Sequence, residues 1–323
     1  MKLLVLGGTA WLGRTTAASA IAAGHDVTCA ARGTDVPRGA QHVRVDRDIA
    51  DGLASLIDTR WDAVIDVSRQ PGQVRRAARQ LRTERYVFVS TCNVYASQAE
   101  IGADESAPLL QPLDADVMTD PEDYGRAKVA CENAVREVFG ADRSAIVRSG
   151  LIGGPGDPTG RSTYWLRRFA APSNPDGVVL APDAPRLPTS LIDVRDLAEW
   201  LVRLAEGAGS GVFNAQGEPH PFPAHLDAAR AAAGHRRTVA AMAEGWLVER
   251  DVNEWAGPRS LPLWLRDTEW YGMNARSTER AVAAGLERRS LESTLADVLD
   301  GPVVSGAGLT DEEERALLAQ LTA

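Results

Sequence analysis

The first half of the chain alternates short apolar runs with helix-forming stretches, and this alternation constrains the fold more than any other feature. Apolar, β-branched runs predict strands at residues 2–6, 26–30, 42–45, 63–66, 86–90 and 144–148. Helices are predicted at residues 13–23, 50–57, 73–82 and 122–139. Strands that alternate with helices form a parallel sheet covered on both faces. The sequence therefore predicts an α/β fold built on a doubly wound parallel sheet.

Composition and charge exclude several classes of protein. The 323 residues are 44% hydrophobic and 24% charged, which is ordinary for a folded globular protein. The net charge of −9, without a run of cations, argues against nucleic-acid binding. The first residues lead straight into an apolar strand, without the pattern of a secretion signal, and no apolar stretch is long enough to span a bilayer. We expect a cytoplasmic protein that does not bind membranes.

A glycine-rich turn follows the first strand, where residues 7–13 read Gly-Gly-Thr-Ala-Trp-Leu-Gly. A strand, a glycine turn and a helix together direct backbone N–H groups and the positive helix end at a pyrophosphate. Gly7 allows the sharp turn, Gly13 allows close helix packing, and Ala10 stands where a middle glycine is commonest. The alternative is a turn with a purely structural role. The residues predicted to bind the dinucleotide here are Gly7, Thr9, Ala10, Trp11, Leu12, Gly13 and Arg14.

The end of the second predicted strand bears on the type of cofactor. An acidic residue there binds the ribose 2′-hydroxyl of NAD, whereas a cation suits the 2′-phosphate of NADP. This chain has Arg32 and no acid, and Arg14 can join it, so NADP(H) is favoured over NAD(H) unless both arginines are only solvated. Asp46, past the third strand, is predicted to meet the adenine, and Val67 and Ser68, past the fourth, the ribose; the alternative is that they are ordinary loop residues.

A tyrosine and a lysine one helical turn apart indicate acid–base chemistry. Tyrosine keeps its proton up to about pH 10, so its use near neutrality requires a nearby cation that stabilises the phenolate. Lys128 is four residues after Tyr124 and supplies that cation. The fifth strand ends in Ser90 and Thr91, and either hydroxyl can bind a substrate oxygen at the carboxyl edge of the sheet. Cys92 adjoins this position.

Together these motifs resemble the extended short-chain dehydrogenase/reductase family, in its NAD(P)-dependent epimerase/dehydratase branch. The resemblance extends over nearly the whole chain and includes residues 7–14, Ser90-Thr91, Val94-Tyr95, Tyr124 with Lys128, residues 148–156 and residues 191–198. It implies a Rossmann-type fold with Thr91, Tyr124 and Lys128 as catalytic residues. Lys128 would also hold the nicotinamide ribose. It implies a homodimer as well. Ala10, Arg32 and Ser149 depart from the family pattern.

The composition changes after residue 150 toward proline, glycine and tryptophan. We expect residues 1–150 to form the dinucleotide-binding domain with the Tyr-Lys helix. Residues 151–323 would form mainly a smaller substrate-binding part that returns some elements to the sheet. Six of the eight tryptophans lie in this second part: Trp165, Trp200, Trp246, Trp255, Trp264 and Trp270. They indicate an aromatic or ring-bearing substrate, or else the core of a small domain. Trp165, Trp264 and Trp270 are the first candidates for substrate contact.

Three further segments carry expectations. Residues 96–120 form a long polar loop before Tyr124, which we interpret as a flap beside the substrate. Residues 310–313 have the pattern of a helix capping box, followed by a short helix that docks on its own domain. The histidines and the three cysteines show no metal-ligand spacing, so no metal is expected.

The expected function is that of an NAD(P)-dependent oxidoreductase which transfers a hydride to or from a carbonyl or alcohol carbon of a small molecule. NADPH-dependent reduction is favoured, with Tyr124 as acid or base. One alternative is a nucleotide-sugar epimerase or dehydratase that oxidises its substrate transiently. A different class is a non-catalytic protein on the same fold that senses a dinucleotide or binds RNA.

Overall fold

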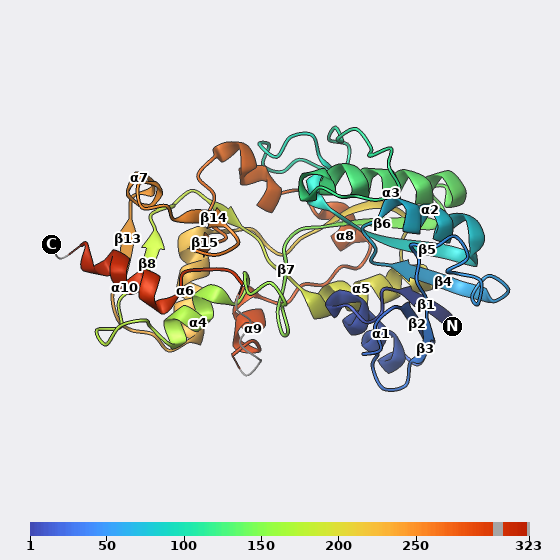
Figure 1. Ribbon diagram of the computed structural model, residues 1–323, viewed down its shortest axis with the longest axis horizontal. Coiled ribbons are helices and arrows are strands. Elements are labelled where there is room, and N and C mark those ends of the chain that lie inside the picture. The colour runs from blue at the N-terminus through green and yellow to red at the C-terminus, as the bar shows by residue number, and fades with distance from the viewer. Residues whose placement is uncertain (300–305, 322–323) are drawn as a thin grey trace.

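A parallel seven-stranded sheet organises the amino-terminal part of the protein, as the computed structural model of residues 1–299 and 306–321 shows (Figure 1). The strands are β1 (Lys2–Leu6), β2 (Asp26–Ala31), β3 (Gln41–Arg44), β4 (Arg60–Asp66), β5 (Arg82–Thr91), β6 (Ser144–Ser149) and β11 (Gly211–Ala215). Their order across the sheet is β11-β6-β5-β4-β1-β2-β3, and every neighbouring pair is parallel. This is the Rossmann strand order, so the predicted fold class is confirmed.

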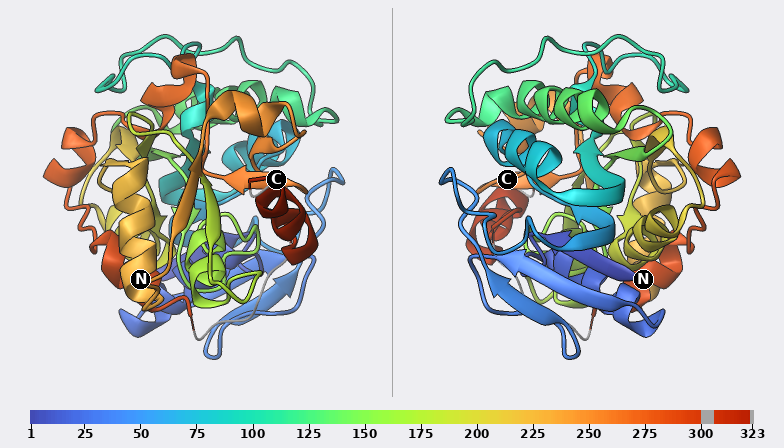
Figure 2. Two further views of the ribbon diagram at one scale, coloured as in Figure 1. Left: turned by 90° about the vertical axis from the view of Figure 1, so that its left-hand side faces the viewer. Right: turned by 90° about the vertical axis from the view of Figure 1, so that its right-hand side faces the viewer.

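Helices cover both faces of this sheet (Figures 1 and 2). One face is covered by α1 (Trp11–Ala22) and α5 (Val194–Glu206), and the other by α2 (Pro71–Gln80) and α3 (Tyr124–Phe139). A strand buried on both sides has no polar face, which explains the continuous apolar runs in the sequence. Burial on both faces also fixes the carboxyl edge of the sheet as the place where strand-end side chains are accessible.

Most of the remaining elements form a second, smaller part, beside the sheet along the long axis of the molecule (Figure 1). Its helices are α4 (Tyr164–Ala170), α6 (Phe222–Ala232), α7 (Glu244–Val248), α9 (Leu291–Ala296) and α10 (Asp311–Ala319). Helix α8 (Glu279–Ala283) packs against β11 of the sheet instead. The strand pairs of the second part are β7 (Ile152–Gly153) with β10 (Ile192–Asp193), β8 (Val179–Pro182) with β13 (Val239–Met242), β9 (Pro188–Thr189) with β12 (His220–Pro221), and β14 (Asn253–Trp255) with β15 (Ser260–Pro262). Short 3-10 turns are η1 (Cys92–Val94), η2 (Pro121–Asp123) and η3 (Thr268–Asn274).

The tryptophans of this part do not all have the role that the sequence suggested. Trp165 and Trp264 are 1% and 0% exposed and belong to its hydrophobic core. The expectation that they are early candidates for substrate contact is therefore wrong, because packing around them leaves no face open. Trp270 is 45% exposed.

The helix predicted at residues 50–57 is also wrong. This segment is a series of turns held by bonds between residues three apart, such as Ala54 N to Asp51 O. Gly52 lies so close to the Asp46 carbonyl that a Cβ there would stand 1.8 Å from the oxygen. Leu53 and Leu56 are buried. Their spacing of three residues is compatible with a run of turns as well as with a helix, so it does not distinguish the two.

The carboxy-terminal helix agrees with its prediction. In α10, Thr310 Oγ1 accepts from Glu313 N, and the Glu313 carboxylate accepts from Thr310 N, which completes the capping box. Leu317 is 1% exposed and packs in the core of the second part. Within residues 1–299 and 306–321, no helix is long and apolar enough to cross a bilayer.

His225 makes the stability of the fold depend on pH. It lies in α6 at 1% exposure, and its Nε2 has no hydrogen-bond partner within the described residues. Burial, with His220 nearby, lowers its pKa from 6.5 to about 4. Between these values the unfolded chain binds a proton that the folded chain does not, so stability falls as the pH falls through this window.

We expect this histidine to remove about 3 kcal/mol of unfolding free energy between pH 7 and pH 4. Urea unfolding of the wild type and of His225→Leu at both pH values measures the difference. The two proteins share every other titrating group, so an identical pH dependence in both would contradict the assignment.

Candidate active site

The glycine turn between β1 and α1 is shaped by two close approaches. Gly7 has φ +90°, in the region that favours glycine. At Gly13 a Cβ would stand 2.3 Å from the Gly7 carbonyl oxygen, so any larger residue would push the helix away from the turn. Ala10 has φ −81° and ψ 156°, which any residue adopts, so its departure from the glycine pattern needs no compensation.

The amino-terminal end of α1 is left without a side-chain cap. Ala10 makes no capping hydrogen bond, and the first turn contains no acidic residue. The first N–H groups of a helix have no intrahelical partner and carry the positive end of its dipole. The turn therefore fits a pyrophosphate by its open N–H groups and by the missing side chain at Gly13.

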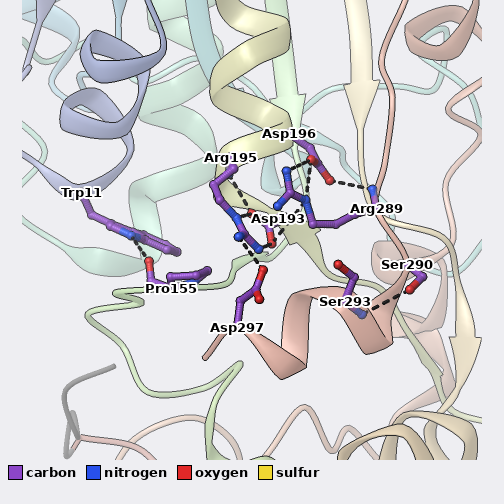
Figure 3. Close-up of polar contacts among 9 residues, drawn as sticks. All are labelled: Trp11, Pro155, Asp193, Arg195, Asp196, Arg289, Ser290, Ser293 and Asp297. Atoms are coloured by element: carbon purple, nitrogen blue, oxygen red, sulfur yellow. Dashed lines mark hydrogen bonds and ion pairs between the residues drawn. The ribbon is translucent and has the colours of Figure 1, made fainter. Parts of the chain in front are cut away.

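Trp11 connects this turn to the second part of the protein (Figure 3). Its indole Nε1 donates to the Pro155 carbonyl oxygen at 2.9 Å. Gly156, with φ +81°, passes so close that a Cβ there would stand 3.2 Å from the same nitrogen. The ring of Trp11 thus lies between the rest of α1 and the turn that follows β7.

An ion-pair network beside Trp11 fastens the later segments to the start of α5 (Figure 3). Arg195 bonds to Asp193 at 2.7 Å and to Asp297 at 2.6 Å. Arg289 bonds to Asp196 at 2.7 Å. These pairs hold α9 and the chain before it against the side of the sheet that carries α1.

The arginines expected to bind a 2′-phosphate lie near the end of β2. Arg32 is highly exposed and pairs with Asp48 at 3.1 Å. Arg14 pairs with Asp35 at 3.3 Å. Both guanidinium groups are thus on the surface at the expected place, each beside an exposed carboxylate that a phosphate would have to displace.

The polar residues predicted past the third and fourth strands have internal partners. Asp46 accepts a hydrogen bond from Asp48 N at 3.0 Å. Ser68 N donates to Asp66 at 2.9 Å, and Asp66 is in turn paired with the buried Arg47. Val67 packs against Gly7, where a Cβ would stand 2.6 Å from its Cγ2.

A cavity of about 400 Å³ lies at the carboxyl edge of the sheet and is shared by both parts of the protein. It is lined by Trp11, Thr91, Cys92, Asn93, Tyr124, Ser149, Gly150, Leu151, Ile152, Thr159, Arg161, Trp255, Met273 and Asn274. Thr91 and Tyr124 therefore face one space, beside Trp11 of the glycine turn. Tyr124 is half-buried in the first turn of α3, and its hydroxyl has no hydrogen-bond partner in the described chain. It is open to meet a substrate oxygen.

Lys128 lies beneath this cavity rather than on its wall. It is 3% exposed, and its Nζ donates to the carbonyl oxygens of Ser68 at 2.7 Å and Val89 at 2.6 Å. It also lies 4.7 Å from the centre of the Phe88 ring. The ammonium group is thus fixed between β4 and β5, with one N–H left for another acceptor.

Ser90 points away from the cavity, so the two hydroxyls at the end of β5 are not equivalent. Its Oγ donates to Glu132 Oε1 at 2.5 Å, inside the packing between the sheet and α3. Successive residues of a strand face opposite sides, which leaves Thr91 on the cavity side. Of the two candidates, Thr91 is the one that lines the cavity.

Most of the cavity lining was not predicted for this site, and three of these residues bear on its chemistry. Cys92 was noted, but burial raises the pKa of its thiol to about 11, so the thiol stays protonated at neutral pH. Arg161 and Trp255 come from distant segments, and no local motif marks them. Residues 96–120 contribute none of the lining and are bonded instead to the segment around Arg276, which donates to Ser97 O and Gln98 Oε1.

The chain is similar to known proteins in sequence and in fold. Residues 3–215 match the model of the NAD dependent epimerase/dehydratase family. No curated protein matches the chain significantly. Similar solved structures include UDP-N-acetylglucosamine 4-epimerase from Bacillus cereus, with 15% identity, a TM-score of 0.68 and coverage of 94% of this chain and 100% of that one. UDP-glucose 4-epimerase from Thermus thermophilus, in complex with NAD, has 19% identity, a TM-score of 0.60 and coverage of 93% and 98%. The UDP-Glc/GlcNAc 4-epimerase from Campylobacter jejuni has 15% identity, a TM-score of 0.65 and coverage of 93% and 98%. At these identities the likeness shows a shared fold.

Proposed function

The chain belongs to the NAD dependent epimerase/dehydratase family, of the extended short-chain dehydrogenase/reductase type, and we propose that it reduces a carbonyl group of a ring-bearing small molecule with NADPH. The observation that carries this proposal is that Thr91 and Tyr124 face one cavity beside the glycine turn. The free hydroxyl of Tyr124 and the aromatic rings of Trp11 and Trp255 in the same lining support it.

Each residue of the site has a separate role in the proposed reaction. The cofactor, when bound, would supply the hydride. Thr91 holds the substrate oxygen by a hydrogen bond, while Tyr124 delivers the proton to that oxygen. Lys128 provides a fixed positive charge below Tyr124 and offers its remaining N–H to the ribose of the cofactor. Because each group is held by the sheet or by α3, positioning contributes a large part of the rate.

Turnover with a panel of ketones, imines and nucleotide sugars tests the proposal. We expect NADPH to be consumed in proportion to the carbonyl compound that disappears, and NADH to be used less well. An isomerised or dehydrated product without net loss of reduced cofactor would instead identify an epimerase or dehydratase. Cofactor binding without turnover of any compound would favour a sensing role.

The preference for NADPH is proposed to come from Arg32. We expect Arg32→Ala to raise KM for NADPH roughly 10- to 100-fold, since a charge-assisted hydrogen bond contributes about 1.5–3 kcal/mol. KM for NADH should change little, because NADH has no 2′-phosphate for Arg32 to bind. Arg38→Ala removes an exposed cation from the same loop and serves as the control. An equal effect of Arg32→Ala on both cofactors would refute the assignment.

A further inference from the structure

Among the described residues, Arg161 is the only one lining the cavity that carries a charge at neutral pH. The other members of the lining described above are apolar, hydroxyl, amide or protonated thiol groups. The described lining thus holds one cation and no acid, so the charged group that it presents to a ligand is positive. This attracts an anionic group of the ligand.

The guanidinium group of Arg161 is held on two sides and open on the third. Its Nε donates to Thr159 Oγ1 at 3.2 Å, and its Cζ lies 5.5 Å from the ring centre of Trp255. Neither Nη atom has a hydrogen-bond or ion-pair partner within the described residues. The open edge is the pair of N–H donors that matches a carboxylate.

The Asp157 carboxylate attracts Arg161 electrostatically but forms no ion pair with it within the described residues. The Asp157 carboxylate is 2% exposed and accepts hydrogen bonds from Thr159 and Ser162, through both backbone N–H groups and both hydroxyls. It is thereby committed to shaping the loop between β7 and α4. Burial lowers the pKa of Arg161, against the opposing effects of Asp157 and Tyr124. An anion bound beside Arg161 would offset the loss of solvation that burial causes.

The ring that supports Arg161 is itself in an unusual conformation. Trp255 has φ +64°, which is rare for a bulky side chain. Its N–H donates to the Trp264 carbonyl oxygen at 3.1 Å, so the fold enforces this backbone. Non-glycine residues in this region cluster at ligand-binding sites. The strained backbone of Trp255 and the open guanidinium group of Arg161 thus lie on the same wall of the cavity.

We propose that Arg161 binds a carboxylate of the substrate, which makes the substrate a small ring-bearing oxo acid. This rests on the proposed reduction and specifies its substrate class. One guanidinium balances one negative charge, and no second cation of the described chain lines the cavity, so a nucleoside diphosphate would bring uncompensated charge into it. Trp255 and Trp11 then supply aromatic walls for the ring.

Equilibrium binding of benzoate tests this without turnover. Benzoate is titrated into the protein saturated with NADP⁺, and tryptophan fluorescence or calorimetry gives Kd. We expect Arg161→Gln to weaken benzoate binding 10- to 100-fold and Arg161→Lys to weaken it less. Benzamide, which has the same ring without the charge, should bind both proteins alike.

Arg250→Gln is the matched control. Arg250 also lies over a tryptophan, with its Cζ 4.0 Å from the ring centre of Trp246, but it is not part of the cavity lining. Its variant should bind benzoate like the wild type. Arg161→Lys keeps the charge, so it remains informative even where Arg161→Gln unfolds.

Two results would overturn the assignment: equal benzoate affinity in wild type and Arg161→Gln, or tighter binding of UDP than of benzoate through Arg161. Failure of the proposed reduction is separate, because benzoate binding requires no hydride transfer. A protein that binds benzoate through Arg161 and reduces no oxo acid would refute the reaction and keep the site.

Discussion

Tyr124→Phe is expected to lower kcat by about 10²–10⁴-fold, the range contributed by one positioned acid or base. The change removes one hydroxyl that has no hydrogen-bond partner in the described chain, so the fold loses no hydrogen bond. The ring remains at the start of α3, where it lines the cavity. Cofactor affinity should therefore stay within about twofold, because the hydroxyl acts in the chemical step and not in cofactor binding. Steady-state kinetics and cofactor titration separate the two quantities.

Thr91→Val gives the matched comparison, because it removes the other hydroxyl to which the proposal gives a role, at similar volume. In the wild type, Thr91 Oγ1 also accepts from Asn93 N at 3.3 Å, so this variant should lose some stability along with activity. Turnover of Tyr124→Phe at the wild-type rate would remove Tyr124 from the mechanism. A parallel loss of cofactor binding would show that its role is structural.

The parts of the fold set by local periodicity could be predicted from the sequence. The apolar runs of β1, β2 and β4 to β6 are buried on both faces, so their strands follow from the sequence of each run. The glycine turn is similarly local, because Gly13 need only approach Gly7, a few residues away. The segment 50–57 was not predictable in this way, since its turns depend on the contact of Gly52 with the Asp46 carbonyl.

The cavity could be predicted only in the half that comes from the sheet and from α3. Thr91 and Tyr124 lie in motifs whose spacing has a chemical meaning. Arg161 and Trp255 come from distant segments, and only tertiary packing brings them to the carboxyl edge. The same limit applies to the tryptophans, because composition cannot distinguish the buried Trp165 from the cavity residue Trp255.

The largest expected effect on stability comes from Glu132, in α3. Its carboxylate pairs with Arg148 at 2.7 Å, and both side chains are 2% exposed. It also accepts from Ser90. Arg148 in turn donates to the Tyr95 hydroxyl at 3.0 Å. One buried carboxylate thus joins α3, β5 and β6.

Glu132→Gln should lower the free energy of unfolding by about 3–5 kcal/mol, because it leaves the Arg148 guanidinium buried without a countercharge. Urea unfolding at pH 7 measures the change. Glu287→Gln breaks the exposed pair with Arg203, whose side chains are 84% and 35% exposed, and should cost less than about 1 kcal/mol. Comparable losses in both variants would show that burial does not set the strength of the Glu132 pair.

Replacing both partners separates the penalty of an orphaned charge from the value of the pair itself. In Glu132→Leu with Arg148→Met, no charge of this pair remains, and apolar side chains of similar size fill the space. Such replacements are often neutral or stabilising. The double variant should therefore recover much of the stability that Glu132→Gln loses. If it does not, the hydrogen bonds to Ser90 and Tyr95, rather than the unpaired cation, account for the loss.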